Sequence, residues 1–182
     1  MTKFRDRYRI ESTRLPGWDY AGAGWYFVTL CTMNHACFFG DVVDGKMHLS
    51  PIGEIVAEEW QKTPQVRPSV RLDGWVIMPN HLHGIIIIEP VVETSRRDVS
   101  TGRGVSTASR LKAGSLGAII GQVKSICTKR IWAIGYTDFA WQARFYDHII
   151  RNGSSLKRIR EYIVNNPAKW KEDRYYAGNP SL

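Results

Sequence analysis

The sequence predicts an α+β fold built on one antiparallel sheet, and two observations lead to this expectation. Segments rich in aromatic and β-branched residues alternate with segments of helical period, in the order strand, helix, strand, strand, helix, strand, helix. The second and third strands are separated only by Pro79-Asn80, so they are expected to pair as a hairpin. A length of 182 residues, 43% of them hydrophobic, suits one domain covering residues 1–182.

The first strand and the first helix carry clear local signals. GWYFVTLCT, residues 24–32, is dominated by aromatic and β-branched residues and is typical of a central strand. Asp44-Gly45 is a hairpin turn signal between two short strands. Ser50 is a suitable N-cap and Pro51 suits the first helical position, so a helix is predicted to begin there. Its buried stripe is expected to comprise Ile52, Ile55, Val56 and Trp60.

The predicted hairpin combines VRLDGWVIMP, residues 70–79, with HLHGIIII, residues 81–88. The segment that follows, at about residues 91–115, is basic, rich in Gly, Ser and Thr, and poor in bulky residues. This composition predicts a mobile basic loop, with an inert linker as the alternative.

A helix, a strand and a terminal helix are predicted after this loop. The apolar stripe of the first helix is expected to comprise Leu116, Ile119, Ile120, Val123, Ile126, Cys127 and Ile131. Residues 139–151 are predicted to form a strand, and Ser154 or Ser155 is expected to cap the terminal helix. This helix is expected to bury Leu156, Ile159 and Ile163. The first six elements match the β-α-β-β-α-β order of a ferredoxin-like fold, in which the first and third strands are central, and the last helix is additional.

The charge of the chain indicates a polyanionic partner. The formal net charge is +8, and the stretch from Arg96 to Arg130 contains eight Lys or Arg residues and one acidic residue. Nucleic acid is the most common partner of such a chain, and a basic surface without a ligand is the alternative. The longest apolar run has four residues, the N-terminal segment is charged, and the three cysteines lack metal-finger spacing. A cytoplasmic location is therefore expected.

His81 and His83 are the first candidates for chemistry. Side chains at positions i and i+2 of a strand point to the same face, so the two imidazoles are expected to lie side by side, with Leu82 on the opposite face. Neutral imidazole is a good ligand for divalent metals, and two rings on one face can share an ion. The alternative is a pair of polar side chains on a solvent-exposed face that bind nothing.

Tyr162 and Asn166 are four residues apart in the terminal helix and are expected to lie almost above one another. The Asn166 amide oxygen could supply a third metal ligand. The alternative is that Tyr162 is a boundary aromatic and that Asn166 only stops the helix before Pro167.

Two histidines, a helical tyrosine and a basic chain together suit cleavage of a phosphodiester through a covalent phosphotyrosine. A phenol has a pKa of about 10, so it needs help to attack at neutral pH. A divalent ion held by His81 and His83 can polarise the phosphate, and Tyr162 can then act as the nucleophile.

The chain resembles the REP-associated tyrosine transposases, which are single-tyrosine members of the histidine–hydrophobic–histidine nuclease superfamily. The matching segments occur in order between Gly24 and Trp170, and they are GWYFVTLCT, WVIMPNHLHGIIII, SLGAIIGQVKS, FAWQARFYDHIIRN and IREYIVNNPAKW. Each motif alone is weak, but five in series are specific.

The resemblance implies a ferredoxin-like fold and a site with Mg²⁺ or Mn²⁺ bound by His81, His83 and Asn166. It implies that Tyr162 cleaves single-stranded DNA near a hairpin, leaving a 5′-phosphotyrosine and a free 3′-OH, and that rejoining needs no ATP. The implied substrates are palindromic repeats of the host genome, and the implied enzyme is a monomer or a homodimer that exchanges its terminal helix.

Several alternatives stay open on the sequence. Tyr146, beside Asp147 and His148, is a competing nucleophile, whereas the Tyr175-Tyr176 pair is interpreted as a tail after the last helix. The residues expected to contact phosphates are Arg103, Arg110, Lys112, Lys124, Lys129 and Arg130. The candidate platforms for unpaired bases are Trp132, Trp141 and Phe145, with core packing preferred for Trp141. The rival functions are a non-catalytic nucleic-acid-binding module and a replication-initiator or relaxase nickase.

Overall fold

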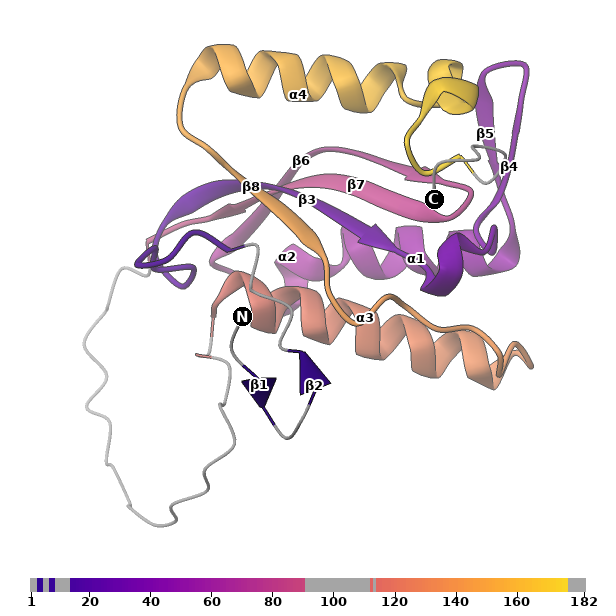
Figure 1. Ribbon diagram of the computed structural model, residues 1–182, viewed down its shortest axis with the longest axis horizontal. Helices are drawn as coiled ribbons and strands as arrows, with labels where there is room; N and C mark the ends of the chain where they lie inside the picture. The colour runs from indigo at the N-terminus through magenta and orange to yellow at the C-terminus, as the bar shows by residue number, and fades with distance from the viewer. Residues whose placement is uncertain (1–2, 5–6, 9–13, 91–111, 113, 177–182) are drawn as a thin grey trace.

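The main sheet of the protein has the strand order of a ferredoxin-like fold. The computed structural model describes residues 3–4, 7–8, 14–90, 112 and 114–176. Four antiparallel strands form the sheet: β3 (Gly24–Cys31), β6 (Val70–Met78), β7 (His81–Ile88) and β8 (Tyr146–Ile150). They lie in the order β6-β7-β3-β8, so the first and third strands of the predicted pattern are central, as expected (Figure 1).

Helices cover both faces of this sheet (Figure 1). On one face lie α1 (Pro51–Gln61), the short α2 (Thr63–Val66) and α3 (Leu116–Ala133), and α4 (Gly153–Asn165) crosses the other face. The larger core, on the side of α1 and α3, includes Leu30, Trp60, Leu82, Ile86 and Ile120. The smaller core, under α4, consists of Phe27, Ile85, Ile150 and Ile163. Because both faces are covered, every residue of β7 is buried, which accounts for the unbroken apolar run after His83.

A glycine is required where α1 packs against β7. A Cβ atom at Gly84 would lie 2.3 Å from Cζ2 of the fully buried Trp60. Only glycine lets the indole approach the strand this closely, so β7, which carries the two histidines, packs directly against α1.

Smaller elements follow the local signals in the sequence. Asp44 and Gly45, with φ angles of 50° and 71°, form the predicted turn between β4 (Gly40–Val43) and β5 (Lys46–Leu49). The Ser50 hydroxyl accepts a hydrogen bond from the backbone of Gly53 and caps α1 as predicted. The remaining elements are β1 (Lys3–Phe4), which pairs with β2 (Arg7–Tyr8), and the 3-10 helices η1 (Met33–His35) and η2 (Pro167–Glu172).

Two sequence-based expectations about the C-terminal half were wrong. The strand predicted over residues 139–151 is limited to β8, and upstream of β8 Trp141 forms only an isolated bridge to Thr32. The cap of α4 is Asn152, whose Oδ1 accepts from the backbone of Ser155 at 2.8 Å, so neither predicted serine caps the helix. Asn is as effective an N-cap as Ser, and a cap two residues before Ser154 lets the helix begin earlier.

The position of α4 over the sheet is held by an apolar contact and an ion pair. Ile163 is buried among the residues of the smaller core. Arg160 makes a two-pronged contact with Asp73 of β6, with Nε–Oδ1 and Nη2–Oδ2 distances of 2.8 and 2.6 Å. These contacts orient the face of α4 that carries Tyr162. No described helix combines the length and the apolar character that crossing a membrane would require.

Candidate active site on the central strand

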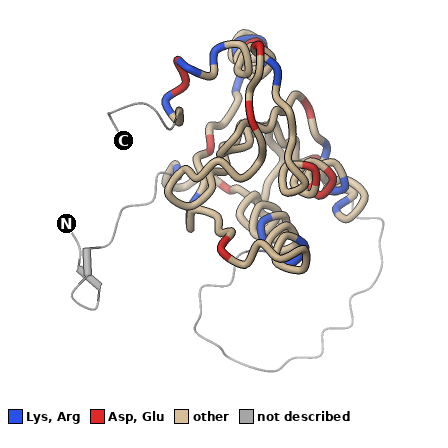
Figure 2. The backbone as a smooth tube through the Cα atoms, turned by 90° about the vertical axis from the view of Figure 1, so that its right-hand side faces the viewer, with Lys and Arg blue, Asp and Glu red and all other residues tan. Residues whose placement is uncertain are grey.

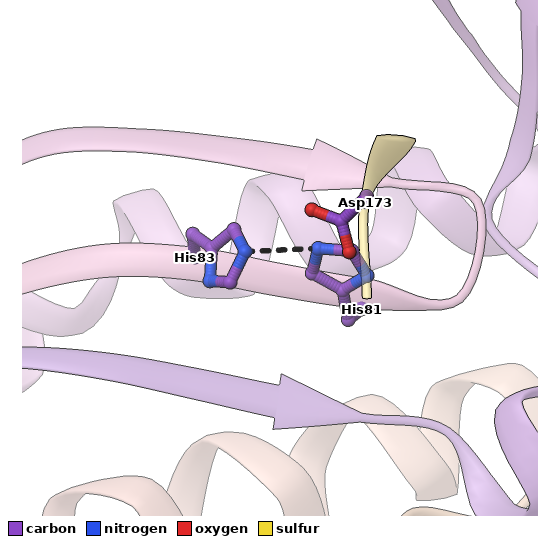
Figure 3. A group of neighbouring side chains, drawn as sticks. All are labelled: His81, His83 and Asp173. Carbon is purple, nitrogen blue, oxygen red and sulfur yellow. Dashed lines mark hydrogen bonds between the residues drawn. The ribbon is translucent and has the colours of Figure 1, made fainter. Parts of the chain in front are cut away.

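His81 and His83 project from β7 to the face of the sheet that α4 covers. The two side chains have 0% and 1% of their surface exposed, and their Nε2 atoms are 3.0 Å apart (Figure 3). Leu82 points to the opposite face and joins the larger core, as the alternation of a strand predicts. The structure therefore excludes the alternative of two histidines on a solvent-exposed sheet face.

Burial keeps both imidazoles neutral at physiological pH. It lowers the pKa of His83 to about 4 and, together with the neighbouring His83 ring, lowers the pKa of His81 well below its ordinary value. A neutral imidazole has a free lone pair on one ring nitrogen, and this is the form that binds metal ions.

Tyr162 comes to these histidines from α4. Its hydroxyl lies 3.0 Å from Nε2 of His83 and donates to Oδ2 of Asp173 at 3.3 Å. Its ring packs edge-on against Phe27, with 6.1 Å between ring centroids. Burial, and then the nearby Asp173 carboxylate, raise the pKa of the Tyr162 phenol above its usual value of 10. The phenol therefore needs a compensating positive charge before it can ionise at neutral pH.

Asn166 ends α4 one turn after Tyr162, as expected. The residue is buried, and its Nδ2 donates to Oδ2 of Asp173 at 2.9 Å. This bond determines which side of the amide carries the oxygen, and the buried Oδ1 has no hydrogen-bond partner among the described residues. A buried acceptor without a partner is costly, so the Asn166 oxygen is suited to accept from, or coordinate, a further group.

Asp173, just after η2, is the site residue that the sequence did not reveal. One of its carboxylate oxygens and a ring nitrogen from each of His81 and His83 lie within 4.8 Å of one another (Figure 3). The backbone of Tyr175 donates to Asp173 Oδ1 at 2.7 Å and holds the carboxylate in place. No sequence spacing connects Asp173 with β7, because the path of η2 determines where the chain comes back to the sheet. In the sequence, the only hint of Asp173 was a carboxylate a few residues after Pro167, where the terminal helix was expected to end.

The interpretation of Tyr175 as part of a tail was wrong. Tyr175 is 8% exposed, and its ring lies 4.8 Å from the ring of His81 and stacks on His35 at 5.5 Å. The segment after η2 therefore forms one wall of the site, because it is anchored by buried aromatic contacts.

These donors fit a divalent cation. Imidazole nitrogens combined with carboxylate and amide oxygens suit first-row divalent ions, and the oxygen ligands also suit Mg²⁺. The unpartnered oxygen of Asn166 is explained if it faces such an ion. His81, His83, Asp173 and Asn166 are thus the residues that could hold a metal.

A cavity of about 480 Å³ opens beside this group. Its lining consists of Arg158, Glu161, Tyr162, Asn165, Asn166, Lys169, Glu172 and Asp173. Tyr162, Asn166 and Asp173 all line it, so the cavity adjoins the candidate nucleophile and two of the candidate metal ligands.

The competing nucleophile Tyr146 lies farther from the histidines. Thr29 pairs with His83 on one side and with Tyr146 on the other, so the three side chains form a row across the sheet. Two strand spacings separate Tyr146 from His83, or about 10 Å. Asp147 points to the other face and pairs with Arg14 at 3.8 Å, so it does not activate Tyr146. His148 is exposed and does not belong to the group of candidate ligands.

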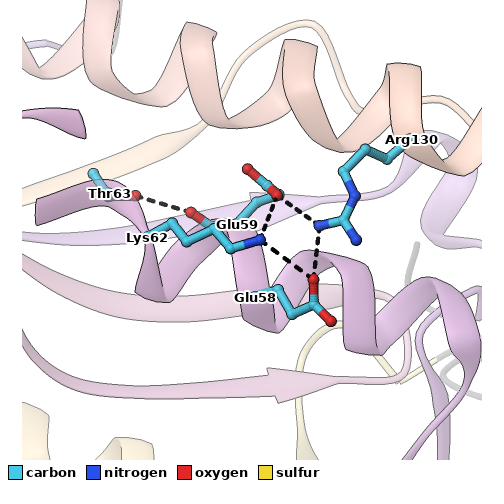
Figure 4. Close-up of polar contacts among 5 residues, drawn as sticks. All are labelled: Glu58, Glu59, Lys62, Thr63 and Arg130. Atoms are coloured by element: carbon cyan, nitrogen blue, oxygen red, sulfur yellow. Dashed lines mark hydrogen bonds and ion pairs between the residues drawn. The ribbon is translucent and has the colours of Figure 1, made fainter. Parts of the chain in front are cut away.

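The predicted phosphate-binding residues have different surroundings. Arg103 and Arg110 lie outside the described residues, as does most of the predicted loop. Lys112 is exposed and pairs with Asp19 at 3.2 Å, and Lys129 is exposed on α3. Arg130 links α3 to α1 by ion pairs of 2.8 and 2.6 Å, which offset its charge (Figure 4); its partners are Glu58 and Glu59.

Lys124 has a different environment from the other predicted phosphate-binding residues. Its ammonium group donates to the backbone carbonyls of Gln142 and Arg144 at 2.7 and 2.9 Å, and it lies 5.7 Å from the ring centre of Trp141. Burial lowers the pKa of Lys124 to about 8. Lys124 therefore holds the segment before β8 through two of its three donor hydrogens.

The aromatic candidates also separate into two kinds. Trp132 is 48% exposed and could stack with a base, whereas Trp141 is buried in the larger core, as preferred from the sequence. Phe145 is half-buried, with the guanidinium of Arg14 at 5.1 Å from its ring centre.

No family model matches this chain. A Haemophilus influenzae protein described as uncharacterized is 38% identical over 169 residues, which cover 91% of this chain and 92% of that protein. The solved structure of a REP-associated tyrosine transposase bound to a REP hairpin superposes with a TM-score of 0.55 at 20% identity, covering 93% of this chain and 74% of the other. The chain therefore belongs to the same family as the Haemophilus influenzae protein, and its fold is that of a REP-associated tyrosine transposase.

Proposed function

We propose that the protein is a metal-dependent tyrosine transposase that cleaves and rejoins single-stranded DNA. The observation that carries the proposal is the 3.0 Å contact between the Tyr162 hydroxyl and Nε2 of His83, within a buried group that also includes His81 and Asp173. A nucleophile, a set of metal ligands and an adjoining cavity are the parts that such a reaction needs.

In the proposed reaction, the Tyr162 oxygen forms a bond to the phosphorus of the scissile phosphate. The bond from phosphorus to the 3′-oxygen breaks, so the products are a 5′-phosphotyrosine and a free 3′-OH. The phenol releases its proton, and the departing 3′-oxygen takes one up. The attack of a 3′-OH on the phosphotyrosine reverses each step, so rejoining needs no ATP.

The metal site assigned in the proposal consists of His81, His83, Asn166 and Asp173. A bound Mg²⁺ or Mn²⁺ would supply Lewis-acid polarisation of the phosphate and offset the charge on the phenolate. Phe27 packs against the ring of Tyr162, and the buried Ile163 holds helix α4 on the sheet. Together they keep the Tyr162 oxygen in a fixed position relative to His81 and His83. Asp173 receives the hydrogen bond of the phenol and orients it.

The proposed substrate is a DNA hairpin with single-stranded flanks, formed by REP-like palindromic repeats. The transposase of the same fold was solved with a REP hairpin. Helix α4 and the segment after it carry both basic and acidic residues (Figure 2). Apart from Arg160, which pairs with Asp73, the basic ones are Lys157, Arg158, Lys169, Lys171 and Arg174. Phosphates could bind there, and Lys129 and the loop at 91–115 could extend the surface. Such an enzyme would act in the cytoplasm at the nucleoid, as a monomer or a homodimer.

A cleavage assay tests this proposal. Purified protein is incubated with Mn²⁺ or Mg²⁺ and with hairpin DNA made from repeats that flank its own gene. The expected product is a covalent protein–DNA adduct, seen as a shifted band on a denaturing gel. Binding without any adduct on such hairpins would favour a non-catalytic nucleic-acid-binding protein. Adducts on origin-like DNA but not on repeats would favour a replication-initiator or relaxase nickase.

A further inference from the structure

Asn80 lies directly next to the candidate metal site and is used by none of the steps above. Its side chain is fully buried, and its Nδ2 donates to two backbone carbonyls, those of His35 at 3.0 Å and Tyr175 at 2.8 Å. Its Oδ1 lies 2.8 Å from Nδ1 of His81. Both hydrogens of the amide nitrogen are therefore used, and both acceptors are carbonyls that cannot donate.

These contacts determine the tautomer of His81. If the amide of Asn80 were reversed, its oxygen would lie against two carbonyl oxygens, so only the orientation with Oδ1 facing His81 is feasible. Because an amide oxygen accepts but cannot donate, Nδ1 of His81 must carry the hydrogen. The free lone pair of His81 is then on Nε2, the atom that faces His83.

His83 is in the opposite state when no ion is bound. Two lone pairs would repel at the 3.0 Å between the Nε2 atoms, so Nε2 of His83 carries a hydrogen directed at His81. Its Nδ1 is then an acceptor, and the hydroxyl of Thr29, 2.8 Å away and buried, donates to it. The same hydrogen can be shared between Nε2 of His81 and the Tyr162 hydroxyl, which both lie 3.0 Å from Nε2 of His83, while that hydroxyl donates to Asp173.

We infer that Asn80 and Thr29 are positioning residues with unequal tasks. Asn80 holds His81 in the metal-binding tautomer at all times, whereas Thr29 lets His83 change tautomer when an ion binds. Two imidazoles can share an ion through Nε2 only if each carries its hydrogen on Nδ1. In His83, Nε2 must lose its hydrogen and Nδ1 must gain one, and the charge of the ring stays the same.

The hydroxyl of Thr29 permits this change because it rotates and can either donate or accept. In the metal-free protein it donates to Nδ1 of His83, and with an ion bound it accepts from the same atom. Asn80 has no such freedom, because its two donors are committed to the loop at His35 and the wall at Tyr175. The inference rests on the metal site of the proposed function but does not require DNA cleavage.

¹⁵N NMR of the imidazole rings measures the tautomers in the full-length protein. In the metal-free wild type, we expect His81 to be protonated at Nδ1 and His83 at Nε2. Zn²⁺ is a suitable probe because it is diamagnetic and binds imidazole. Its addition should leave His81 unchanged and move the hydrogen of His83 to Nδ1. A metal-free spectrum with His81 protonated at Nε2, or with His83 already protonated at Nδ1, overturns the inference.

Variants test the unequal tasks. Asn80→Ala should give mixed tautomers at His81 and weaken Zn²⁺ binding about 10–100-fold, the usual effect of losing a partner of a metal-bound histidine. Thr29→Val removes only a hydroxyl that supports both tautomers of His83, so its affinity loss should be smaller, and Thr29→Ser should bind like the wild type. Equal losses in Asn80→Ala and Thr29→Val contradict the inference. If Asn80→Ala does not fold, the wild-type spectra still decide.

These outcomes are distinct from those of the cleavage assay. A protein with the expected tautomers that forms no adduct with any hairpin would refute the proposed function and support the assignment of Asn80 and Thr29. A protein that cleaves hairpins but shows the opposite tautomers would refute that assignment and support the proposed function.

Discussion

The hydroxyl of Tyr162 lies 3.0 Å from Nε2 of His83, although 79 positions separate the two residues in the chain. The strand β7 turns the histidines toward one face of the sheet, and α4 lays the phenol over the same face. The candidate nucleophile and the candidate metal ligands therefore come from different elements. A substitution can therefore remove the nucleophile and leave the metal ligands in place, or the reverse.

Tyr162→Phe should abolish the covalent adduct. The change removes one oxygen and keeps the ring on Phe27, so the fold should be retained and hairpin binding should stay within about threefold of wild type. A denaturing gel with labelled hairpin DNA measures the adduct. The control is Tyr146→Phe, which should leave adduct formation detectable because Tyr146 lies two strands from His83. Adduct in the Tyr162 variant and none in the Tyr146 variant would move the nucleophile to β8.

Divalent ions should stabilise the wild type and not the histidine variants. At an ion concentration of 100 times Kd, the wild type should gain about 2.7 kcal/mol of unfolding free energy. His81→Ala and His83→Ala each leave a gap in a buried site, so both should lose on the order of 2 kcal/mol without metal and gain little with it. Urea unfolding with Mn²⁺ or with a chelator measures both effects. An equal metal-dependent gain in all three proteins would show that the ion binds elsewhere.

Asp173→Asn should weaken the binding of Mn²⁺ at least about tenfold, or 1.4 kcal/mol. The amide keeps the shape and an acceptor for the backbone of Tyr175, but it removes the negative charge among the candidate ligands. Calorimetric titration of the full chain measures the affinity. Glu172→Gln is the matched control, since Glu172 is exposed and does not belong to the ligand group. The assignment of Asp173 fails if the two variants bind Mn²⁺ equally well.

Two lysines of α3 should behave differently. Lys129→Ala should weaken hairpin binding and reduce the slope of log affinity against log salt by roughly 0.7, the value for one phosphate contact on a single strand. Lys124→Met should leave that slope unchanged and lower the unfolding free energy by on the order of 2 kcal/mol, because two carbonyls lose a charged donor. Neutralising Arg103, Arg110 and Lys112 together should also flatten the salt dependence. A changed slope in Lys124→Met would return this residue to the DNA-binding surface.

The ion pair that anchors α4 should make stability depend on acid pH. The hydrogen bonds from Arg160 lower the pKa of Asp73 below its usual value of 3.8. Because the folded pKa is the lower one, the stabilisation is complete above about pH 4 and is lost as the pH falls below that value. Arg160→Gln should therefore lose less stability than the wild type between about pH 5 and pH 2. Arg158→Gln, on the same helix, should retain the wild-type pH profile in urea unfolding.

Local patterns in the sequence were enough to predict the sheet and the elements of the candidate site that lie close together in the chain. The two-residue period of a strand placed His81 and His83 on one face, and the pitch of a helix placed Asn166 one turn after Tyr162. Both relationships depend only on backbone geometry over two to four residues. The strand order followed from the sequence of elements, because few arrangements of β-α-β-β-α-β are compact.

Contacts between distant segments were decided by the tertiary structure alone. The chain after Pro167 turns through η2 and brings Asp173 to the histidines, a path set by the burial of Trp170 and Tyr175 rather than by any local period. Lys124 was expected at a phosphate but meets two carbonyls 18 and 20 residues away. Sequence determines the direction of a side chain from its own strand or helix; the partners that it meets depend on how separate elements pack, and that is decided only when the whole core forms.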